Sequence, residues 1–286
     1  MSINSQVLEI GVVDELPYIE ANLHYLIPMP EKPVIYIDEP PPGIPRYNGK
    51  YEAYKLPIRN ARLIKRNLSL DQEGFTFVNH HSAVSNFYDD NEIRRVYYPE
   101  AEQLLLKATG ATKVIVFDHN VRNTLRSQQN QNNVREPVKR VHNDFTAKSG
   151  YSRARLVLEA LKIEDAEALL QRRFSIVNVW RPIAEPVQED PLAICDAKSM
   201  AKTDLVASDL VYRNRVGETY GITYNPTHQW FYFPQMQKHE VVLIKCFDSS
   251  EDIDARFTAH TAFEDPTSLP DAPPRESIEL RTLVFY

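Results

Sequence analysis

The chain has 286 residues, which is enough for one large domain or two small ones and for a core that needs no disulfide. Its net charge is −6 with acidic and basic residues interleaved, which argues against a nucleic-acid partner. It has two cysteines, apolar runs too short to span a bilayer and no secretory signal at its start, so we expect a soluble, cytoplasmic protein.

The N-terminal region, residues 1–95, has little regular pattern. Prolines separate short extended pieces such as KPVIYI and YEAYKLPI. We therefore expect an irregular region. Its segment around His80 and Ser82 is a candidate lid over a binding site, the alternative being a solvated connector.

Residues 96–173 are predicted to hold helices and the strand that carries a His-x-Asp motif. In YPEAEQLLLKATGA, Leu104, Leu105 and Ala108 share a face, and Gly110 stands where a helix would end. TKVIVFDHNV is then a buried strand, and the polar run 126–137 is a surface loop and a second candidate lid. The patterns SRARLVLEAL and EDAEALLQRR predict two further helices.

From residue 174 to the end the pattern is that of β-strands. Runs rich in β-branched and aromatic residues are separated by Pro, Asn, Asp and Ser. Their hairpin-like spacing predicts antiparallel sheets. We therefore predict one α+β, mainly β domain over residues 1–286, in which residues 174–286 form a double-stranded β-helix (jelly roll) core and the helices are N-terminal or inserted.

One short motif in the middle of the chain suggests a metal site. VKRVHNDFT holds the only His-x-Asp of the sequence, His142 and Asp144. Residues two apart on an extended segment point to the same side, so the imidazole and the carboxylate could bind one metal ion. The pair alone is a weak signal, because this spacing also occurs by chance.

A third metal ligand would have to come from a distant strand. His260 in FTAHTAF is the best candidate, because a jelly roll returns its last strands beside the strand that carries the first pair. Two imidazoles and one carboxylate leave three positions of an octahedral ion open, as in non-haem iron oxygenases. Other histidines fit better as turn, connector, pocket or structural residues: His80, His81, His119, His228 and His239.

Residues near the C-terminus could bind a carboxylate. Arg275 and Ser277 share one side of the last predicted strand, and Arg281 lies on the same period-two face. A guanidinium binds a carboxylate through two hydrogen bonds, and 2-oxoglutarate carries such a group at the end remote from the metal. A surface salt bridge of Arg275 with Glu276 or Asp271 is the alternative.

These motifs, with blocks such as YYPEAEQLLLKATGATKVIVFDHNVR, RRFSIVNVWRPI and HQWFYFPQM, resemble the Fe(II)/2-oxoglutarate-dependent oxygenases, and more narrowly the AsaB-type hydroxylase/desaturase group. The resemblance runs from about residue 50 to the end. It implies that the protein uses Fe(II), 2-oxoglutarate and O2, that the three candidate ligands bind the iron, and that Arg275 with Ser277, or else Arg281, anchors 2-oxoglutarate. It further implies oxidation of an unactivated C–H bond by hydroxylation, desaturation or rearrangement.

The substrate implied by the resemblance is an apolar small molecule, a specialised metabolite such as a terpenoid, meroterpenoid or polyketide. The strands predicted to form the wall of the substrate pocket are consistent with an apolar substrate, because they offer aromatic side chains rather than a cluster of charges. The candidate pocket residues are Trp180, Arg181, His228, Trp230 and Tyr232. A non-catalytic jelly-roll partner or small-molecule binding protein and a zinc hydrolase are the alternatives, and a homodimer and a heterodimer both stay open.

Overall fold

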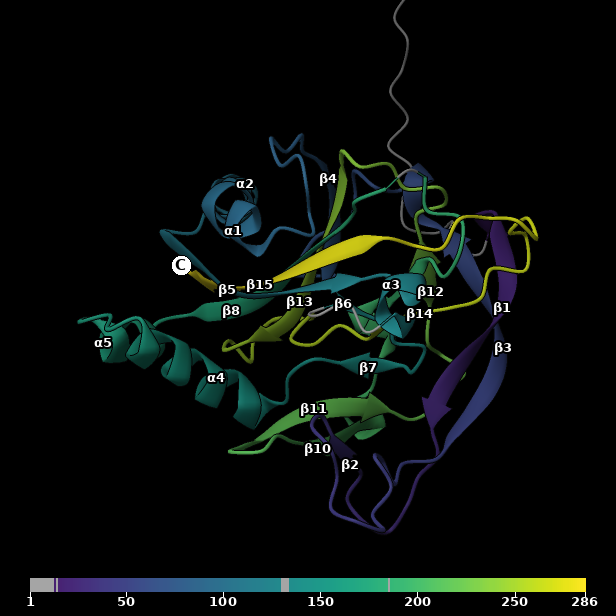
Figure 1. The fold of residues 1–286 in the computed structure, drawn as a ribbon, viewed down its shortest axis with the longest axis horizontal. Helices are drawn as coiled ribbons and strands as arrows, with labels where there is room; N and C mark the ends of the chain where they lie inside the picture. Colours follow the sequence, from purple (N-terminus) through teal and green to yellow (C-terminus); the bar gives the residue numbers. More distant parts are fainter. Residues whose placement is uncertain (1–12, 14, 130–133, 185) are drawn as a thin grey trace, which may run out of the picture.

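Two β-sheets packed face to face make up the body of the protein (Figure 1). The structure is a computed structural model, and it describes residues 13, 15–129, 134–184 and 186–286. The larger sheet has nine strands in the order β1-β3-β12-β9-β14-β7-β11-β10-β2, and the smaller has six in the order β4-β13-β8-β15-β5-β6. This is the curled double sheet of a jelly roll, so the predicted fold class is confirmed.

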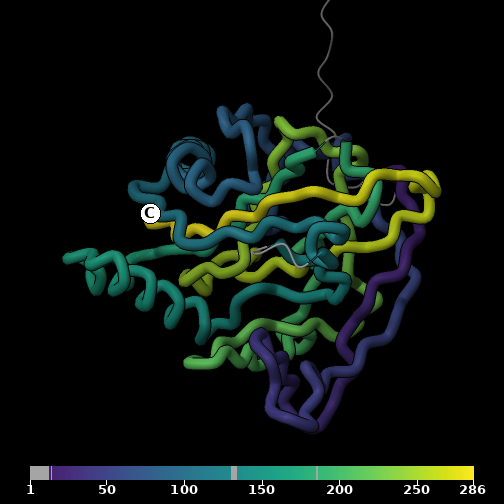
Figure 2. Tube along the Cα trace, in the orientation of Figure 1, coloured from purple at the N-terminus to yellow at the C-terminus, as the bar shows by residue number. Residues whose placement is uncertain are grey.

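The chain passes several times from one sheet to the other, and its course can be followed along the tube in Figure 2. The strands are β1 (Tyr18–Leu26), β2 (Val34–Tyr36), β3 (Tyr51–Asn60), β4 (Phe75–Asn79), β5 (Lys113–Arg122), β6 (Val134–Arg135), β7 (His142–Asn143), β8 (Phe174–Pro182), β9 (Leu192–Cys195), β10 (Leu205–Val211), β11 (Val216–Ile222), β12 (Trp230–Tyr232), β13 (Glu240–Asp248), β14 (His260–Ala262) and β15 (Ser277–Phe285). The α-helices are α1 (Asp90–Glu92), α2 (Tyr98–Thr109), α3 (Thr124–Gln128), α4 (Ala147–Ala160) and α5 (Ala166–Gln171), and a π-helical turn, Ile93–Tyr97, joins α1 to α2.

Three apolar clusters hold these layers together. The first lies between the sheets and joins residues such as Ile176 on β8 to Ile194 on β9 and Phe231 on β12. The second lies on the other face of the smaller sheet, where α2 covers it with Leu105 (Figure 1). The third lies on the other face of the larger sheet, around Trp230. Each central strand is therefore buried on both sides.

The predicted helices are confirmed, with one difference in length. Helix α2 ends at Gly110, which adopts a left-handed backbone with φ 68°. Helix α4 begins several residues before the apolar pattern, because Thr146 and Ser149 form a capping box that satisfies its first amide groups. The run predicted as a surface loop instead contains helix α3 and strand β6, while residues 130–133 lie outside the described residues.

The N-terminal region is more regular than expected: the predicted extended piece YEAYKLPI is part of strand β3, whereas strands β1 and β4 were not predicted. Strands β1 and β3 pair along nine residues and form one edge of the larger sheet, at the right of Figure 1, and β4 forms an edge of the smaller sheet. Strand β1 buries Ala21, Leu23 and Tyr25, and the polar residues between them lowered its apolar signal. None of the helices in the described part of the chain has the length and hydropathy needed to span a membrane.

Candidate active site

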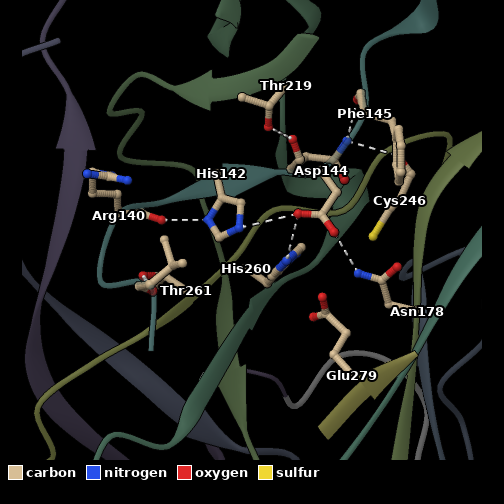
Figure 3. A network of polar contacts seen from close by, with 12 residues as sticks. Arg140, His142, Asp144, Phe145, Asn178, Thr219, Cys246, His260, Thr261 and Glu279 are labelled. Carbon is tan, nitrogen blue, oxygen red and sulfur yellow. Dashed lines mark hydrogen bonds and ion pairs between the residues drawn. The ribbon is translucent and has the colours of Figure 1, made fainter. Parts of the chain in front are cut away.

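Two short neighbouring strands bring the candidate metal ligands together. Strand β14 pairs with β7 so that His260 lies directly opposite His142, and Asp144 follows β7 (Figure 3). One ligand atom of each residue lies within 4.8 Å of the others. The Asp144 Oδ1 atom is 3.5 Å from His142 Nε2 and 3.9 Å from His260 Nε2. The sequence-based choice of these three residues therefore agrees with the geometry.

Backbone carbonyls orient both imidazoles. The His142 Nδ1 atom lies 2.7 Å from the Arg140 carbonyl oxygen, and the His260 Nδ1 atom lies 3.1 Å from the Thr258 carbonyl oxygen. A carbonyl can only accept, so each Nδ1 must carry the proton and donate it. Each Nε2 is then left with a lone pair directed at Asp144, which is the arrangement that metal-binding histidines use.

The second carboxylate oxygen of Asp144 is held by the smaller sheet. Its Oδ2 atom accepts a hydrogen bond from Asn178 Nδ2 on β8 at 2.9 Å, which is drawn in Figure 3. It accepts a second hydrogen bond from Arg281 Nε on β15 at 3.2 Å. Burial opposes ionisation of Asp144, yet the Arg281 guanidinium holds the pKa of its carboxyl well below the ordinary value. Asp144 is thus an anion with one oxygen fixed and the other turned to the histidines.

The protonation state of His260 also suits a metal. Burial, followed by the neighbouring His142, lowers the pKa of His260 to about 4, so its imidazole is neutral at neutral pH. Only a neutral imidazole has the lone pair that binds a metal. Two imidazoles and one carboxylate that converge on one point form the donor set that non-haem Fe(II) takes on one face.

Two polar residues that the sequence motifs did not reveal lie beside this group. Asn178 and Glu279 are both buried, and Figure 3 shows the Glu279 carboxylate facing Asp144. Burial, followed by Asp144, raises the pKa of the Glu279 carboxyl. A signal was present in the sequence, because each is a lone amide or acid inside a strand of apolar residues.

The candidate carboxylate seat lies at the start of β15. The Arg275 guanidinium is 4% exposed, lies over the Trp180 ring at 5.6 Å, and donates from Nη1 to the Asp190 carbonyl oxygen at 2.5 Å. Burial, followed by the neighbouring Arg122, lowers its pKa to about 10, so it stays charged at neutral pH. The Arg275 Nε and Ser277 Oγ atoms are buried and have no hydrogen-bond partner in the described part of the chain.

These two unpaired groups fit the carboxylate of 2-oxoglutarate. A buried donor without a partner costs about 1–3 kcal/mol, and a guanidinium and a hydroxyl are the donors that a carboxylate accepts from. Arg281 is placed differently, because its guanidinium already contacts Asp144, Asp118 and Glu279. Of the two candidate arginines, only Arg275 offers an unpaired donor beside Ser277.

A cavity of about 270 Å³ opens beside the metal-ligand group. His142, Asp144 and Arg281 are among the residues that line it. Its wall comes from β10, β11 and α4, and from Arg135 and Val138 in the segment that precedes His142. Arg135 belongs to the second candidate lid, residues 126–137, so part of that segment lines the cavity. The first candidate lid does not line it, and its Ser82 hydroxyl donates to Glu100 instead.

The side chains proposed from the sequence as a substrate pocket do not line this cavity. Trp230 and Tyr232 pack in the cluster on the far face of the larger sheet, since β12 turns only Phe231 toward the space between the sheets. His228 is bound between Tyr25 Oη and Asp204 Oδ2, both at 3.0 Å. Alternation along β12 puts successive side chains on opposite faces of the sheet, but the sequence did not indicate which face meets the space between the sheets.

The other two proposed pocket residues lie on β8, on opposite faces of the smaller sheet. Trp180 faces the space between the sheets and supports Arg275. Arg181 faces the helical side, where its guanidinium lies over the Phe87 and Tyr97 rings and donates to the His80 carbonyl oxygen at 3.1 Å.

The histidines set aside in the sequence analysis lie outside the ligand group. The His119 Nδ1 atom is 2.8 Å from Tyr98 Oη, and His239 stacks on His81 with ring centroids 5.3 Å apart. Within the described residues, His142, Asp144 and His260 are the group of His, Cys, Asp and Glu side chains close enough to hold one ion. A jelly roll with this donor set inside it defines the class of mononuclear non-haem iron oxygenases.

Comparison with known proteins supports that class. A family model described as "Oxidoreductase/YMDC permease-like domain" matches residues 23–285. The hydroxylase/desaturase efuI of Hormonema carpetanum is 31% identical over 259 residues, which are 83% of this chain and 85% of that one. The alpha-ketoglutarate-dependent dioxygenase phiK of a fungal species is 35% identical over 229 residues, 77% of this chain and 80% of that one.

A solved structure is similar over nearly the whole chain. The iron and alpha-ketoglutarate-dependent endoperoxidase NvfI superimposes with a TM-score of 0.82 at 30% identity, covering 94% of this chain and 98% of that one. The chain therefore belongs to this family, the Fe(II)/2-oxoglutarate-dependent dioxygenases, and it requires Fe(II), 2-oxoglutarate and O2. The resemblance seen in the sequence is confirmed, and the relatives do not favour a non-catalytic protein or a zinc hydrolase.

Proposed function

We propose that His142, Asp144 and His260 bind the Fe(II), that Arg275 and Ser277 bind the distal carboxylate of 2-oxoglutarate, and that the enzyme oxidises a C–H bond of a largely apolar specialised metabolite. The observation that carries the proposal is the pair of buried, unpaired donors, Arg275 Nε just before β15 and Ser277 Oγ at its first residue; the same strand presents Arg281 to Asp144. Such donors are costly unless a ligand accepts from them.

The protein's own side chains would act by holding and orienting. The backbone carbonyls that accept from both Nδ1 atoms fix the imidazoles. Asn178 and Arg281 keep the Asp144 carboxylate ionised and in one rotamer, which leaves Oδ1 for the metal. When bound, Fe(II) with 2-oxoglutarate and O2 supplies the oxidising power, while the protein supplies position and a site shielded from water.

The cavity supports an apolar body for the substrate. Its wall includes Ile35, Phe145, Leu156 and Leu210. Whether the product is hydroxylated, desaturated or rearranged depends on which hydrogen lies nearest the iron, a matter of about an ångström. A cytoplasmic location stays a prediction, and two buried cysteines that are both free support it.

The direct test is spectroscopic. Anaerobic addition of Fe(II) and then 2-oxoglutarate should give the visible charge-transfer band of the chelate. Succinate, which lacks the keto group, is the matched control and should give none. Absence of the band in the wild-type protein, or its full retention in His260→Ala, would contradict the assignment.

A further inference from the structure

Arginines crowd the cavity that leads to the metal ligands. Six arginines line it, against two carboxylates, Asp144 and Glu218. Both carboxylates are already engaged, because Asp144 accepts from Arg281 and Glu218 binds the Lys32 ammonium at 2.6 Å. The wall therefore carries more positive than negative charge, which the aromatic strands considered in the sequence analysis did not suggest.

Two of these arginines, Arg153 and Arg215, line the same cavity and lie close enough for the charge of Arg215 to act on Arg153. Arg153 comes from helix α4 and Arg215 from the turn between β10 and β11. Their guanidiniums lie over aromatic rings, that of Arg153 over Phe117 at 5.6 Å and that of Arg215 over Tyr212 at 3.6 Å. Neither makes an ion pair with an acidic residue in the described part of the chain.

The acids around this pair are occupied elsewhere. Asp118 acts on Arg153 from a distance, but Arg281 Nη1 binds it at 3.3 Å. Asp90, which lines an adjoining cavity of about 280 Å³ together with both arginines, pairs with Arg94 Nε at 2.7 Å. Burial, followed by Arg215, lowers the pKa of Arg153, as expected for two like charges held close together in a half-buried place.

This pair is separate from the seat for 2-oxoglutarate. Neither Arg275 nor Ser277 lines the cavity, whereas Arg153 and Arg215 do. Arg122, which also lines it, lies opposite Ser277 in the sheet and so belongs to the neighbourhood of the seat. The co-substrate therefore does not explain the charges of Arg153 and Arg215.

We propose that the substrate carries one oxyanion group, a carboxylate or a phosphate, on its apolar body, and that Arg153 and Arg215 bind this group. The proposal rests on the proposed function and refines its substrate class. The planar forks of two guanidiniums suit an oxyanion, and their stacking on Phe117 and Tyr212 holds them in place for it. The apolar wall residues then receive the rest of the molecule, with the oxidised carbon near His142 and Asp144.

A pair of fluorescent probes tests the proposal without knowledge of the natural substrate. 1-Anilinonaphthalene-8-sulfonate combines apolar rings with one oxyanion, and N-phenyl-1-naphthylamine has the same rings without it. Both are titrated into the full chain under anaerobic conditions with Fe(II) and saturating 2-oxoglutarate, so that the co-substrate seat is filled. The variants are Arg153→Gln, Arg215→Gln and both together. Arg155→Gln is the matched control, because Arg155 lies on the same helix but is exposed and pairs with Glu167.

The double variant should bind the sulfonate probe at least about tenfold more weakly and the neutral probe within about twofold of the wild type. Arg155→Gln should change neither. Displacement of the sulfonate probe by octanoate or by octyl phosphate then shows which oxyanion the pair prefers, and displacement by neither would count against the proposal. Equal weakening of both probes, or no change in either, would overturn it.

The same variants separate this inference from the proposed function. The charge-transfer band and the affinity for 2-oxoglutarate should be unchanged in the double variant. If that affinity falls by the same factor as probe binding, the two arginines belong to the co-substrate and the inference is wrong. If the wild type forms no band but still prefers the anionic probe, the proposed function fails while the anion site stands.

Discussion

Replacing Arg275 by alanine is the sharpest test of the co-substrate seat. The guanidinium is almost fully buried, lies over Trp180 and donates to the Asp190 carbonyl oxygen, so the protein holds it in one orientation before any ligand arrives. Its unpaired Nε and the adjacent Ser277 Oγ are then available to a carboxylate. Arg275→Ala removes the charge and leaves that carboxylate facing a buried, partly apolar site.

The expected loss follows from the burial. Removing one partner of a buried, hydrogen-bonded charge pair costs about 2–5 kcal/mol. At about 1.4 kcal/mol per factor of ten, the dissociation constant for 2-oxoglutarate should rise about 30-fold to several thousand-fold. Ser277→Ala removes one neutral donor, worth about 0.5–1.5 kcal/mol, and should raise it only about two- to twelvefold. Arg275→Lys should recover part of the affinity, since an ammonium cannot form the fork of two bonds.

The assay is an anaerobic titration of the Fe(II)-loaded protein with 2-oxoglutarate, followed by the charge-transfer band, with near-UV circular dichroism as the control for folding. In Arg275→Ala the band should reach its full height at a much higher concentration. Arg281→Ala should instead lower the affinity for Fe(II), because Arg281 contacts Asp144. The reasoning is refuted if Arg275→Ala binds 2-oxoglutarate within about threefold of the wild type while Arg281→Ala loses it.

Three further predictions follow from the same structure. Alanine at any of the three proposed iron ligands should abolish Fe(II) binding, measured by equilibrium dialysis, with the circular dichroism spectrum unchanged, whereas His239→Ala should bind iron normally. Asn178→Ala should weaken Fe(II) binding about 10- to 100-fold, because one hydrogen bond to Asp144 Oδ2 is lost; unchanged affinity would argue that Arg281 alone holds the carboxylate. Gly150→Ala should lower the melting temperature by several degrees without altering iron affinity, because its Cβ would lie 2.4 Å from the Phe247 ring, an overpacking that costs about 1–3 kcal/mol; an unchanged melting temperature would show that the ring can move aside.

A large part of the candidate active site could be predicted from local patterns in the sequence. The period of two along an extended segment placed His142 and Asp144 on one side, and the same rule placed Arg281 on one face with Ser277. The contact of Arg281 with Asp144 was not predicted. The jelly-roll prediction then selected His260, and β14 does pair with β7 at His142. The helix ending at Gly110 and the buried strand after it were likewise readable from short windows.

Other features depended on contacts that no short window contains. The pairing of β12 with β9 and β3 decides which of its faces meets the space between the sheets. The sequence therefore suggested Trp230 as a pocket residue, although the fold directs its side chain to the opposite face of the sheet. Strand β1 becomes regular only because β3, many residues later, pairs with it.

The sequence alone indicated the chemistry, because the candidate metal ligands and the two candidate carboxylate-binding arginines could be proposed from residue type and from spacing along the chain. Only the tertiary structure decided what surrounds that chemistry. Arg153 on a helix and Arg215 in a turn have no pattern in common, and they line one cavity because α4 packs across the β10–β11 hairpin. Substrate recognition depends on side chains from elements that are distant in the chain, and long-range packing, rather than local periodicity, brings such side chains together.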